Sequence, residues 1–362
     1  MTGPSQITQR ASVQNSADDA GHNPLYHGKR GKVVRSHGPH AVQHIAVLSV
    51  EVHANSTNNK LPNPDGLGGQ GQGKVMAICF WVQDDTFSVG SQYGDGTTLL
   101  GSEGGVIVVQ PETCSEQGAA HGLGMGQGVW VKAVLDEVAL FLEFVRVVEV
   151  LNPDIIIGYD IQGGSLGYLM ERAAVIQAKN APSFPPGFSL ETKLSRAPDE
   201  PKHEKHRNDS WGADRGSDIW LVGRIVLNIW RILRSEVKHG RYGFEDMALH
   251  LLDERQPRFT TRDLNGWFKG TGAGVPGGGR AKQKVGGVDP HPLRWRTLRY
   301  YLLRARGSLR MLEQLDLIGS TSEMARLFGI DFYSVLTRGS QYVSYTVGSL
   351  LLLYSFSSWH IW

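Results

Sequence analysis

The sequence is poor in cysteine and shows no targeting segment. Only two cysteines occur, Cys79 and Cys114, and their separation matches no zinc-ligand spacing, so we expect reduced thiols in a reducing compartment. Residues 1–23 lack the apolar core that a secretory signal peptide needs. The thirteen histidines are scattered, and the two within 203–206 lie in a polar stretch. We therefore expect no metal site and no cofactor in this chain.

A net excess of either charge is also missing. Lys and Arg number 37 and Asp and Glu number 35, which gives a formal net charge of +2. This balance implies no overall attraction to nucleic acid, so any such contact must depend on local patches. The sequence has no long apolar span either. The stretch 343–362 carries no charge, but its apolar run is short, is interrupted by serine and is flanked by no basic cluster. We expect no membrane association.

Glycine, in contrast, is abundant and clustered. The chain has 45 glycines, with dense tracts at 64–74, 118–128 and 270–284. A glycine-rich phosphate-binding loop needs a strand before it and a helix directly after it, and none of these tracts meets that requirement. We interpret them as parts of flexible loop insertions. The insertions are expected near 56–73, 114–130, 179–216 and 270–291.

The segments between the insertions predict an α/β fold with a mixed sheet flanked by helices. Three β-rich runs come first and suggest a small antiparallel meander. A long apolar segment then predicts one helix over 131–153, with Lys132 and Asp136 on its polar stripe and Pro153 at its end. A strand, a helix and a further strand that runs into a helical turn follow. The expected ranges are 44–54, 74–85 and 105–110 for the meander, then 154–159, 165–178 and 223–233.

This order of elements is the one found in ribonuclease-H-like nucleases, and three long segments carry a more specific resemblance. They resemble the exonuclease-like region of family B DNA polymerases. The stretches "LSRAPDE" and "LTRGSQY" are most similar to a translesion member of that family. The segments begin "LNPDIIIGYDIQGG", "SDIWLVGRIVLN" and "RGSLRMLEQLDL" and cover 151–176, 217–252 and 306–342.

The resemblance implies a domain organisation and a biological setting. It implies a parent enzyme that is a DNA-directed DNA polymerase, active in translesion synthesis and DNA repair in the nucleus, with DNA and accessory subunits as partners. Mg²⁺ is expected only for the full polymerase. We expect a disordered lead-in (1–42), a ribonuclease-H-like 3'-5' exonuclease domain (43–318), the start of a polymerase palm (319–342) and a divergent apolar tail (343–362).

The resemblance stops after Tyr342, and the palm carboxylates of the family have no counterpart in this chain. The tail is therefore interpreted as an abnormal end, such as a truncated reading frame. We expect that the chain does not polymerise DNA by itself.

The resemblance also implies that the exonuclease site is vestigial. Active members hold two divalent ions with four carboxylates. The first family motif, Asp-x-Glu, matches Ser49 to Glu51, and the metal-holding Asp of the second motif is replaced by Ser165. The third motif, Tyr-x-x-x-Asp, falls on Tyr301 and Ala305. Independently, Ala305 belongs to an apolar stripe of helical spacing, which predicts a buried position.

Only Glu51 remains of the four ligands, which predicts an inactive nuclease. An alternative is an independent metal-dependent nuclease with rearranged ligands, built from Glu51, Asp160 and Asp154. This alternative requires the three carboxyl groups to converge within about 5 Å of one point. A simpler interpretation of Asp160 is a residue that caps a turn.

Two groups of residues are candidates for DNA contact. Arg299, Arg306 and Arg310 recur at helical spacing and would form a basic face, unless they are merely solvated. Arg338, Gly339, Ser340 and Gln341 match a family segment that borders the template strand, unless they form an ordinary turn. Phosphate contacts of this kind would give binding that is sensitive to salt and independent of sequence.

Overall fold

The computed structural model describes most of the predicted exonuclease domain and the segment that follows it. The lead-in 1–42, the tail 343–362 and most of the four insertions lie outside the described residues, so the predictions for them stay predictions. Two described parts of the insertions differ from flexible loops, because Leu190–Leu194 form a helix with two buried leucines and residues 129–130 begin a strand. The described residues are 45–56, 61–66, 72–84, 103–109, 128–178, 184–185, 187–197, 219–269 and 292–337.

Six strands form one mixed sheet in the described part of the chain, in the order β4-β3-β2-β1-β5-β6. The pairs β1–β2 and β2–β3 are antiparallel, which confirms the predicted meander. The pairs β1–β5, β5–β6 and β3–β4 are parallel. The strands are β1 (Ala46–Ala54), β2 (Val75–Asp84), β3 (Gly104–Val109), β4 (Val129–Val134), β5 (Ile155–Gly158) and β6 (Ile225–Asn228).

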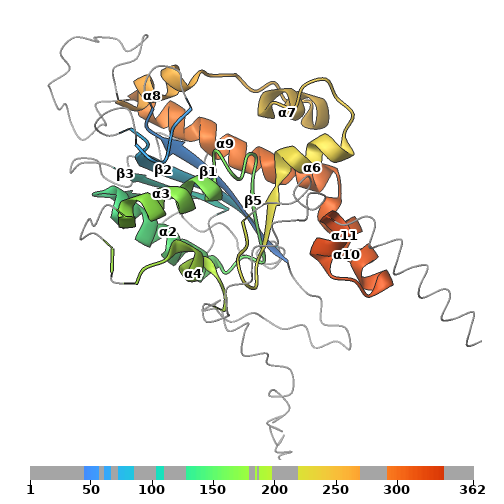
Figure 1. Cartoon of the computed structure of the whole chain (residues 1–362). Coiled ribbons are helices and arrows are strands. Elements are labelled where there is room, and N and C mark those ends of the chain that lie inside the picture. The colour runs from blue at the N-terminus through green and yellow to red at the C-terminus, as the bar shows by residue number, and fades with distance from the viewer. Residues whose placement is uncertain are drawn as a thin grey trace, which may run out of the picture.

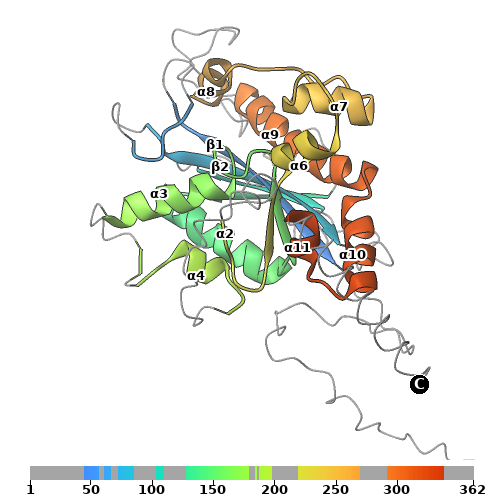
Figure 2. The ribbon, with the colours of Figure 1, turned by 45° about the vertical axis from the view of Figure 1, so that its right-hand side comes forward.

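Helices cover both faces of the sheet, which confirms the predicted α/β class (Figure 1). The first face carries α2 (Glu137–Leu151), α3 (Leu166–Ala178) and α4 (Leu190–Leu194). The second face carries α6 (Ile229–Glu236), α7 (Phe244–Leu252), α8 (Thr261–Lys269) and α9 (Pro292–Gln314). Two further helices, α10 (Leu317–Phe328) and α11 (Phe332–Thr337), follow the end of α9 (Figure 2). No helix of the described residues is long and apolar enough to span a membrane.

The single helix predicted over 131–153 is wrong in its first part. Residues Val129–Val134 form strand β4, which pairs in parallel with β3, so Lys132 lies on a strand. Asp136 is the N-cap of α2, and its carboxylate accepts a hydrogen bond from the Ala139 N–H at 2.7 Å. The end of the helix is as expected, since Asn152 adopts a left-handed conformation immediately before Pro153. Pairing with β3 satisfies the backbone of this apolar run, which its sequence alone does not reveal.

The alternation of β1 places its polar side chains beneath α9. Leu48, Val50 and Val52 belong to the hydrophobic cluster that includes α2 and α3. Val47 belongs to the cluster that includes α9, and residues two apart on a strand share a face. Every second residue after Val47 therefore points from the sheet into the core on the α9 side, and the next three of these residues are polar. They are Ser49, Glu51 and His53.

Candidate functional site

The candidate site is the row of polar side chains on β1 below α9. Ser49, Glu51 and His53 have exposed fractions of 0%, 2% and 1%. Burying a polar or charged group without a partner is costly, so each of these side chains needs an account of its hydrogen bonds.

Glu51 has two donors, one from the sheet and one from α9. Its Oε1 accepts a hydrogen bond from the Tyr159 N–H at 3.1 Å, and its Oε2 accepts one from the Arg304 Nε at 3.1 Å. Burial raises the pKa of the Glu51 carboxyl, and the Arg304 guanidinium and the Tyr159 N–H act against that rise. Glu51, the carboxylate predicted to match the first family motif, is thus bonded to a cationic side chain.

Arg304 contacts a second carboxylate. Its Nη1 lies 3.7 Å from Oε1 of Glu245 on α7 and donates to the Tyr300 hydroxyl at 3.3 Å. The Tyr300 hydroxyl in turn donates to Glu245 Oε1 at 2.7 Å. Desolvation lowers the pKa of the guanidinium, but the charge of Glu51 and the bond to Tyr300 more than offset it, so that the pKa is raised overall. A permanent positive charge lies in the middle of the site.

Ser165, which was predicted to replace the second family Asp, is also buried and hydrogen-bonded. Its side chain is 0% exposed, and its hydroxyl donates to the carbonyl of Val50 at 2.5 Å. The side chain packs directly on β5, because a Cβ added at Gly158 would lie 2.5 Å from the Ser165 Oγ. This hydroxyl ties the turn after β5 to β1 and is not directed at an open ligand position.

The prediction that Ala305 is buried is confirmed, since its side chain is 0% exposed within the hydrophobic cluster below α9. The α9 side chain that reaches Glu51 is Arg304, one residue earlier, and sequence analysis missed it. The spacing Tyr-x-x-x-Asp placed one residue earlier falls on Tyr300 and Arg304, which both lie in the site. This alternative register is the feature of the sequence from which Arg304 could have been predicted.

His53 is the second residue that sequence analysis missed. Its ring lies 4.7 Å from the Phe268 ring and 5.2 Å from the Tyr301 ring, centroid to centroid. Neither ring nitrogen has a hydrogen-bond partner among the described residues, and the same holds for the Ser49 hydroxyl. Burial, assisted by the charge of Lys269, lowers the pKa of His53 to about 3. The signal in the sequence is its position, two residues after Glu51 on the same face of the strand.

The three carboxylates of the alternative nuclease do not converge. Asp160 is exposed, and its Oδ1 accepts from the Gly163 N–H at 3.3 Å, as expected of a turn cap. Asp154 lies at the other end of β5, where its Oδ2 accepts from the Ala46 N–H at 2.8 Å. Ala46 is five positions before Glu51 on β1, roughly 16 Å at the rise of an extended strand. The convergence that this alternative requires is contradicted by these positions.

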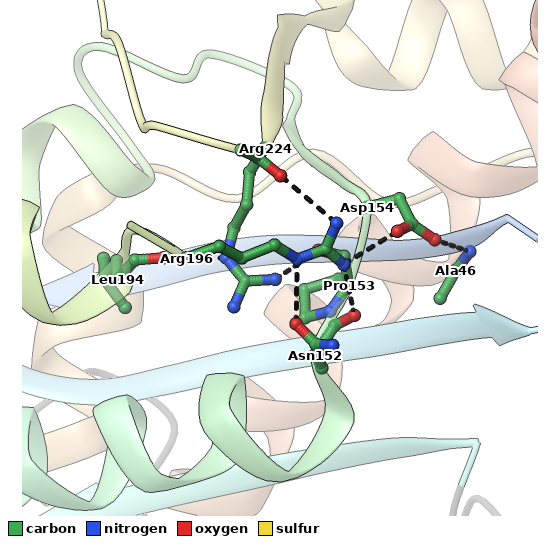
Figure 3. Close-up of polar contacts among 8 residues, drawn as sticks. Ala46, Asn152, Pro153, Asp154, Leu194, Arg196 and Arg224 are labelled. Carbon is green, nitrogen blue, oxygen red and sulfur yellow. Dashed lines mark hydrogen bonds and ion pairs between the residues drawn. The ribbon is translucent and has the colours of Figure 1, made fainter. Parts of the chain in front are cut away.

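Asp154 belongs instead to a polar cluster centred on an arginine (Figure 3). Arg196 donates to Asp154 Oδ1 at 2.7 Å, to Asn152 Oδ1 at 2.9 Å and to the Gly223 carbonyl at 3.2 Å. Arg224 donates to the carbonyl of Leu194 at 2.7 Å. These bonds join the segment after α4, the start of β5 and the segment before β6. The cluster therefore stabilises the fold.

The residues at the candidate site do not fit a pair of divalent ions. Two-metal chemistry needs several carboxylates around a shared position. The predicted motif positions Ser49 and Ser165 hold buried hydroxyls, and the guanidinium of Arg304 is bonded to Glu51. Across the described residues, no three His, Cys, Asp or Glu side chains gather in a way that could hold a metal ion.

All three arginines of the predicted basic face lie on α9, within the described residues. Arg299 and Arg306 are exposed, and the Arg306 guanidinium lies 5.1 Å from the centroid of the Trp81 ring. Arg310 is half-buried and forms an ion pair with Glu254. The predicted template segment, Arg338 to Gln341, lies outside the described residues. Its DNA contact, and that of the α9 face, stay predictions.

Comparison with known proteins supports the resemblance read from the sequence. The model of "DNA polymerase family B, exonuclease domain" matches residues 29–243, which is more than half of the chain. The chain is 36% identical over 305 residues to the DNA polymerase zeta catalytic subunit of Mus musculus, covering 84% of this chain and 9% of that protein. The corresponding protein of Homo sapiens is 35% identical over 305 residues, again covering 84% of this chain and 9% of the relative.

The plant relative matches a similar share of the chain. The DNA polymerase zeta catalytic subunit of Arabidopsis thaliana is 32% identical over 338 residues, covering 86% of this chain and 15% of that protein. The matched region thus spans only 9% to 15% of the length of these relatives. With the mixed sheet, the flanking helices and the match to the family model taken together, the chain belongs to the family B DNA polymerases, in the exonuclease domain of that family.

Proposed function

We propose that this chain is part of a translesion DNA-directed DNA polymerase of the zeta type, in which its exonuclease-fold domain is catalytically inactive. The domain would act as a scaffold and as one wall of the path of the DNA. The relatives that are 35% and 36% identical to this chain carry the name of the zeta catalytic subunit, which supports the choice of branch within the family. Such a polymerase would work in the nucleus in DNA repair, with accessory subunits as partners.

The observation that carries the proposal is the ion pair between Glu51 and Arg304. A two-metal nuclease activates water on one ion and steadies the leaving oxygen with the other. In this site the only family carboxylate is bonded to a guanidinium at 3.1 Å, and that positive charge repels a divalent cation at the same place. An inactive proofreading site suits an enzyme that extends past damaged bases, because removing mispaired ends would undo its product.

Nucleotide binding and Mg²⁺ belong, in this proposal, to the palm of the whole polymerase and not to the described residues. An independent nuclease is not favoured, because Asp154 lies beside Ala46 at the far end of β1 from Glu51, and Asp160 is exposed and caps a turn. The role left to this domain is to fold stably and to present a surface to DNA.

The first test concerns nuclease activity. The purified chain with Mg²⁺ or Mn²⁺ is expected to leave labelled single-stranded DNA intact, and Glu51→Ala is expected to change nothing measurable in this assay. An active family B proofreading domain serves as the positive control. Metal-dependent digestion that disappears in Glu51→Ala would contradict the proposal, whereas digestion that persists in that variant would indicate a contaminating nuclease.

The second test concerns the DNA path. Arg338→Ala and Arg306→Ala are each expected to weaken binding of single-stranded DNA about equally for all sequences, and to flatten the slope of log K against log salt by roughly 0.7. Arg310→Ala is expected to have a smaller effect, because Arg310 already pairs with Glu254. Fluorescence anisotropy with labelled oligonucleotides at low and high salt measures both quantities.

The matched control for binding is Arg258→Ala, because Arg258 is exposed, forms no ion pair among the described residues and belongs to neither predicted group. This variant removes one positive charge without touching the proposed path. If it weakens binding as much as Arg338→Ala does, the binding is unspecific attraction and the proposed path is wrong.

A further inference from the structure

The guanidinium of Arg304 is the point at which two buried or half-buried carboxylates from different elements meet. Glu51 comes from β1 and lies 3.1 Å from its Nε, whereas Glu245 comes from α7 and lies 3.7 Å from its Nη1. The side chains of Glu51, Glu245 and Arg304 are 3%, 15% and 18% exposed. One cation therefore serves two anions in a place that is largely shielded from water.

The surroundings of Arg304 hold the cation in place. Its guanidinium carbon lies 4.8 Å from the centroid of the Phe244 ring, 5.6 Å from that of Tyr159 and 5.7 Å from that of Tyr300. Aromatic faces attract a guanidinium, more strongly where water is excluded. The Tyr300 hydroxyl bonds both Arg304 and Glu245, which fixes the relative positions of the two charges.

Without this cation the site would hold two carboxylates near each other with no compensating charge. A buried charge that loses its partner is strongly destabilising, and neighbouring like charges add to the penalty. In a carboxylate cluster that binds metal, the divalent ion supplies the compensating charge, but such an ion can leave. An arginine is always protonated and is attached to the chain, so its charge is permanent.

We propose that Arg304 is a permanent internal cation whose guanidinium supplies the positive charge that a bound metal ion would otherwise supply. It thereby holds β1, α7 and α9 together without any divalent ion. Glu51 and Glu245 are then its counter-ions, and together they form a latent cation site that opens only when the guanidinium is removed. This inference rests on the proposed function, because an active site of this family would need Glu51 as a ligand.

The test compares the stability of the full chain with and without divalent ions. Urea unfolding of the wild type, followed by circular dichroism, is expected to have the same midpoint in EDTA, Mg²⁺ and Mn²⁺. Arg304→Met is expected to raise the equilibrium constant of unfolding by about 10²- to 10³-fold in EDTA, because it leaves Glu51 buried and unpaired. Added Mn²⁺ is expected to restore part of that loss in Arg304→Met alone, and to bind this variant in a calorimetric titration.

Three further variants sharpen the test. Glu51→Gln combined with Arg304→Met removes both charges, so it is expected to be more stable than Arg304→Met and to lose the response to Mn²⁺. Arg299→Met is the matched control on the exposed side of the same helix and is expected to unfold near the wild-type midpoint. Arg304→Lys keeps the charge but loses the planar fork, and is expected to lie between the wild type and Arg304→Met.

Several outcomes would overturn the inference. They are a wild-type midpoint that falls in EDTA, an Arg304→Met variant as stable as Arg299→Met, and an Arg304→Met variant that does not respond to Mn²⁺. If Arg304→Met does not fold at all, Arg304→Lys decides: a Lys variant that also fails to fold would show that the charge is not what matters. A wild type that needs divalent ions for stability but digests no DNA would refute this inference and leave the proposed function standing.

Discussion

Arg172→Met is expected to lower the free energy of unfolding by about 3 to 5 kcal/mol, the range found when one partner of a buried ion pair is removed. Arg172 on α3 binds Glu137 in a two-pronged arrangement, with Nε to Oε1 and Nη2 to Oε2 both at 2.9 Å. The two side chains are 7% and 12% exposed. The loss would be large because Glu137 also accepts a hydrogen bond from the Val75 N–H at 2.7 Å, and Arg172 donates to the Pro64 carbonyl at 2.9 Å.

The pair therefore joins α3, the first turn of α2, the start of β2 and the segment that contains Pro64. Urea unfolding measures the effect, and Arg146→Met is the matched control. Arg146 pairs with Glu143 on the surface of α2, with a side chain that is 51% exposed, so its loss should cost at most about 1 kcal/mol. Equal effects of the two substitutions would mean that the buried pair contributes no more than a surface pair.

Arg172→Lys tests the geometry of the same pair. A lysine ammonium is a single point charge and cannot make two parallel bonds to one carboxylate while also reaching the Pro64 carbonyl. We expect it to recover only a minor part of the loss. Full recovery would show that the charge alone stabilises this junction.

The strands could be predicted where a run of strand-forming residues was bounded on both sides by turn-forming residues. β1, β2, β3 and β5 are short runs of β-branched and aromatic residues between turn formers, and the structure places strands in all of them. Residues 131–134 of β4 were predicted as helix because "VKAV" continues without a break into the apolar pattern of α2, and residues 129–130 were predicted as the end of an insertion. Only its pairing with β3, a contact between distant parts of the chain, decides for strand.

The candidate site was predictable in position but not in its central residue. The family motifs led to Glu51 and Ser165, and both lie where β1 meets the turn after β5. On α9 the apolar stripe led correctly to Ala305 in the core, but the side chain that reaches Glu51 is that of Arg304, one residue earlier. Neighbouring residues on an α-helix point about 100° apart. Ala305 can therefore face the core while Arg304 reaches Glu51.

The second carboxylate that contacts Arg304, Glu245, could not be predicted from the sequence. Glu245 lies on α7, far from β1 and α9 in the chain, and it belongs to no family motif. The sequence predicts that three motif positions lack a carboxylate, but it does not show that the guanidinium of Arg304 reaches Glu51. The same applies to His53, whose burial next to Phe268 and Tyr301 depends on how α8 and α9 pack on the sheet.

His53 is expected to make the stability of the domain fall as the pH is lowered from about 6.5 toward 3. Its pKa is about 3 in the folded chain, against 6.5 in the unfolded chain, because burial disfavours the charged ring. Between these values the unfolded chain binds a proton that the folded chain does not, so unfolding is favoured as the pH falls. At about 1.4 kcal/mol for each pH unit, the loss from this residue reaches about 3 kcal/mol near pH 4.

His53→Leu isolates this effect from that of every other titrating group. Both ring nitrogens lack a partner among the described residues, so replacing the ring by an apolar side chain should be neutral or stabilising near pH 7.5. The variant should then lose less stability than the wild type between pH 6.5 and 4, and the difference between their unfolding free energies should grow steadily across that range. His239→Leu, at an exposed histidine, is the control and should follow the wild type. Parallel curves for His53→Leu and the wild type would mean that His53 takes up a proton without unfolding, and that water or a polar group reaches the charged ring in the folded chain.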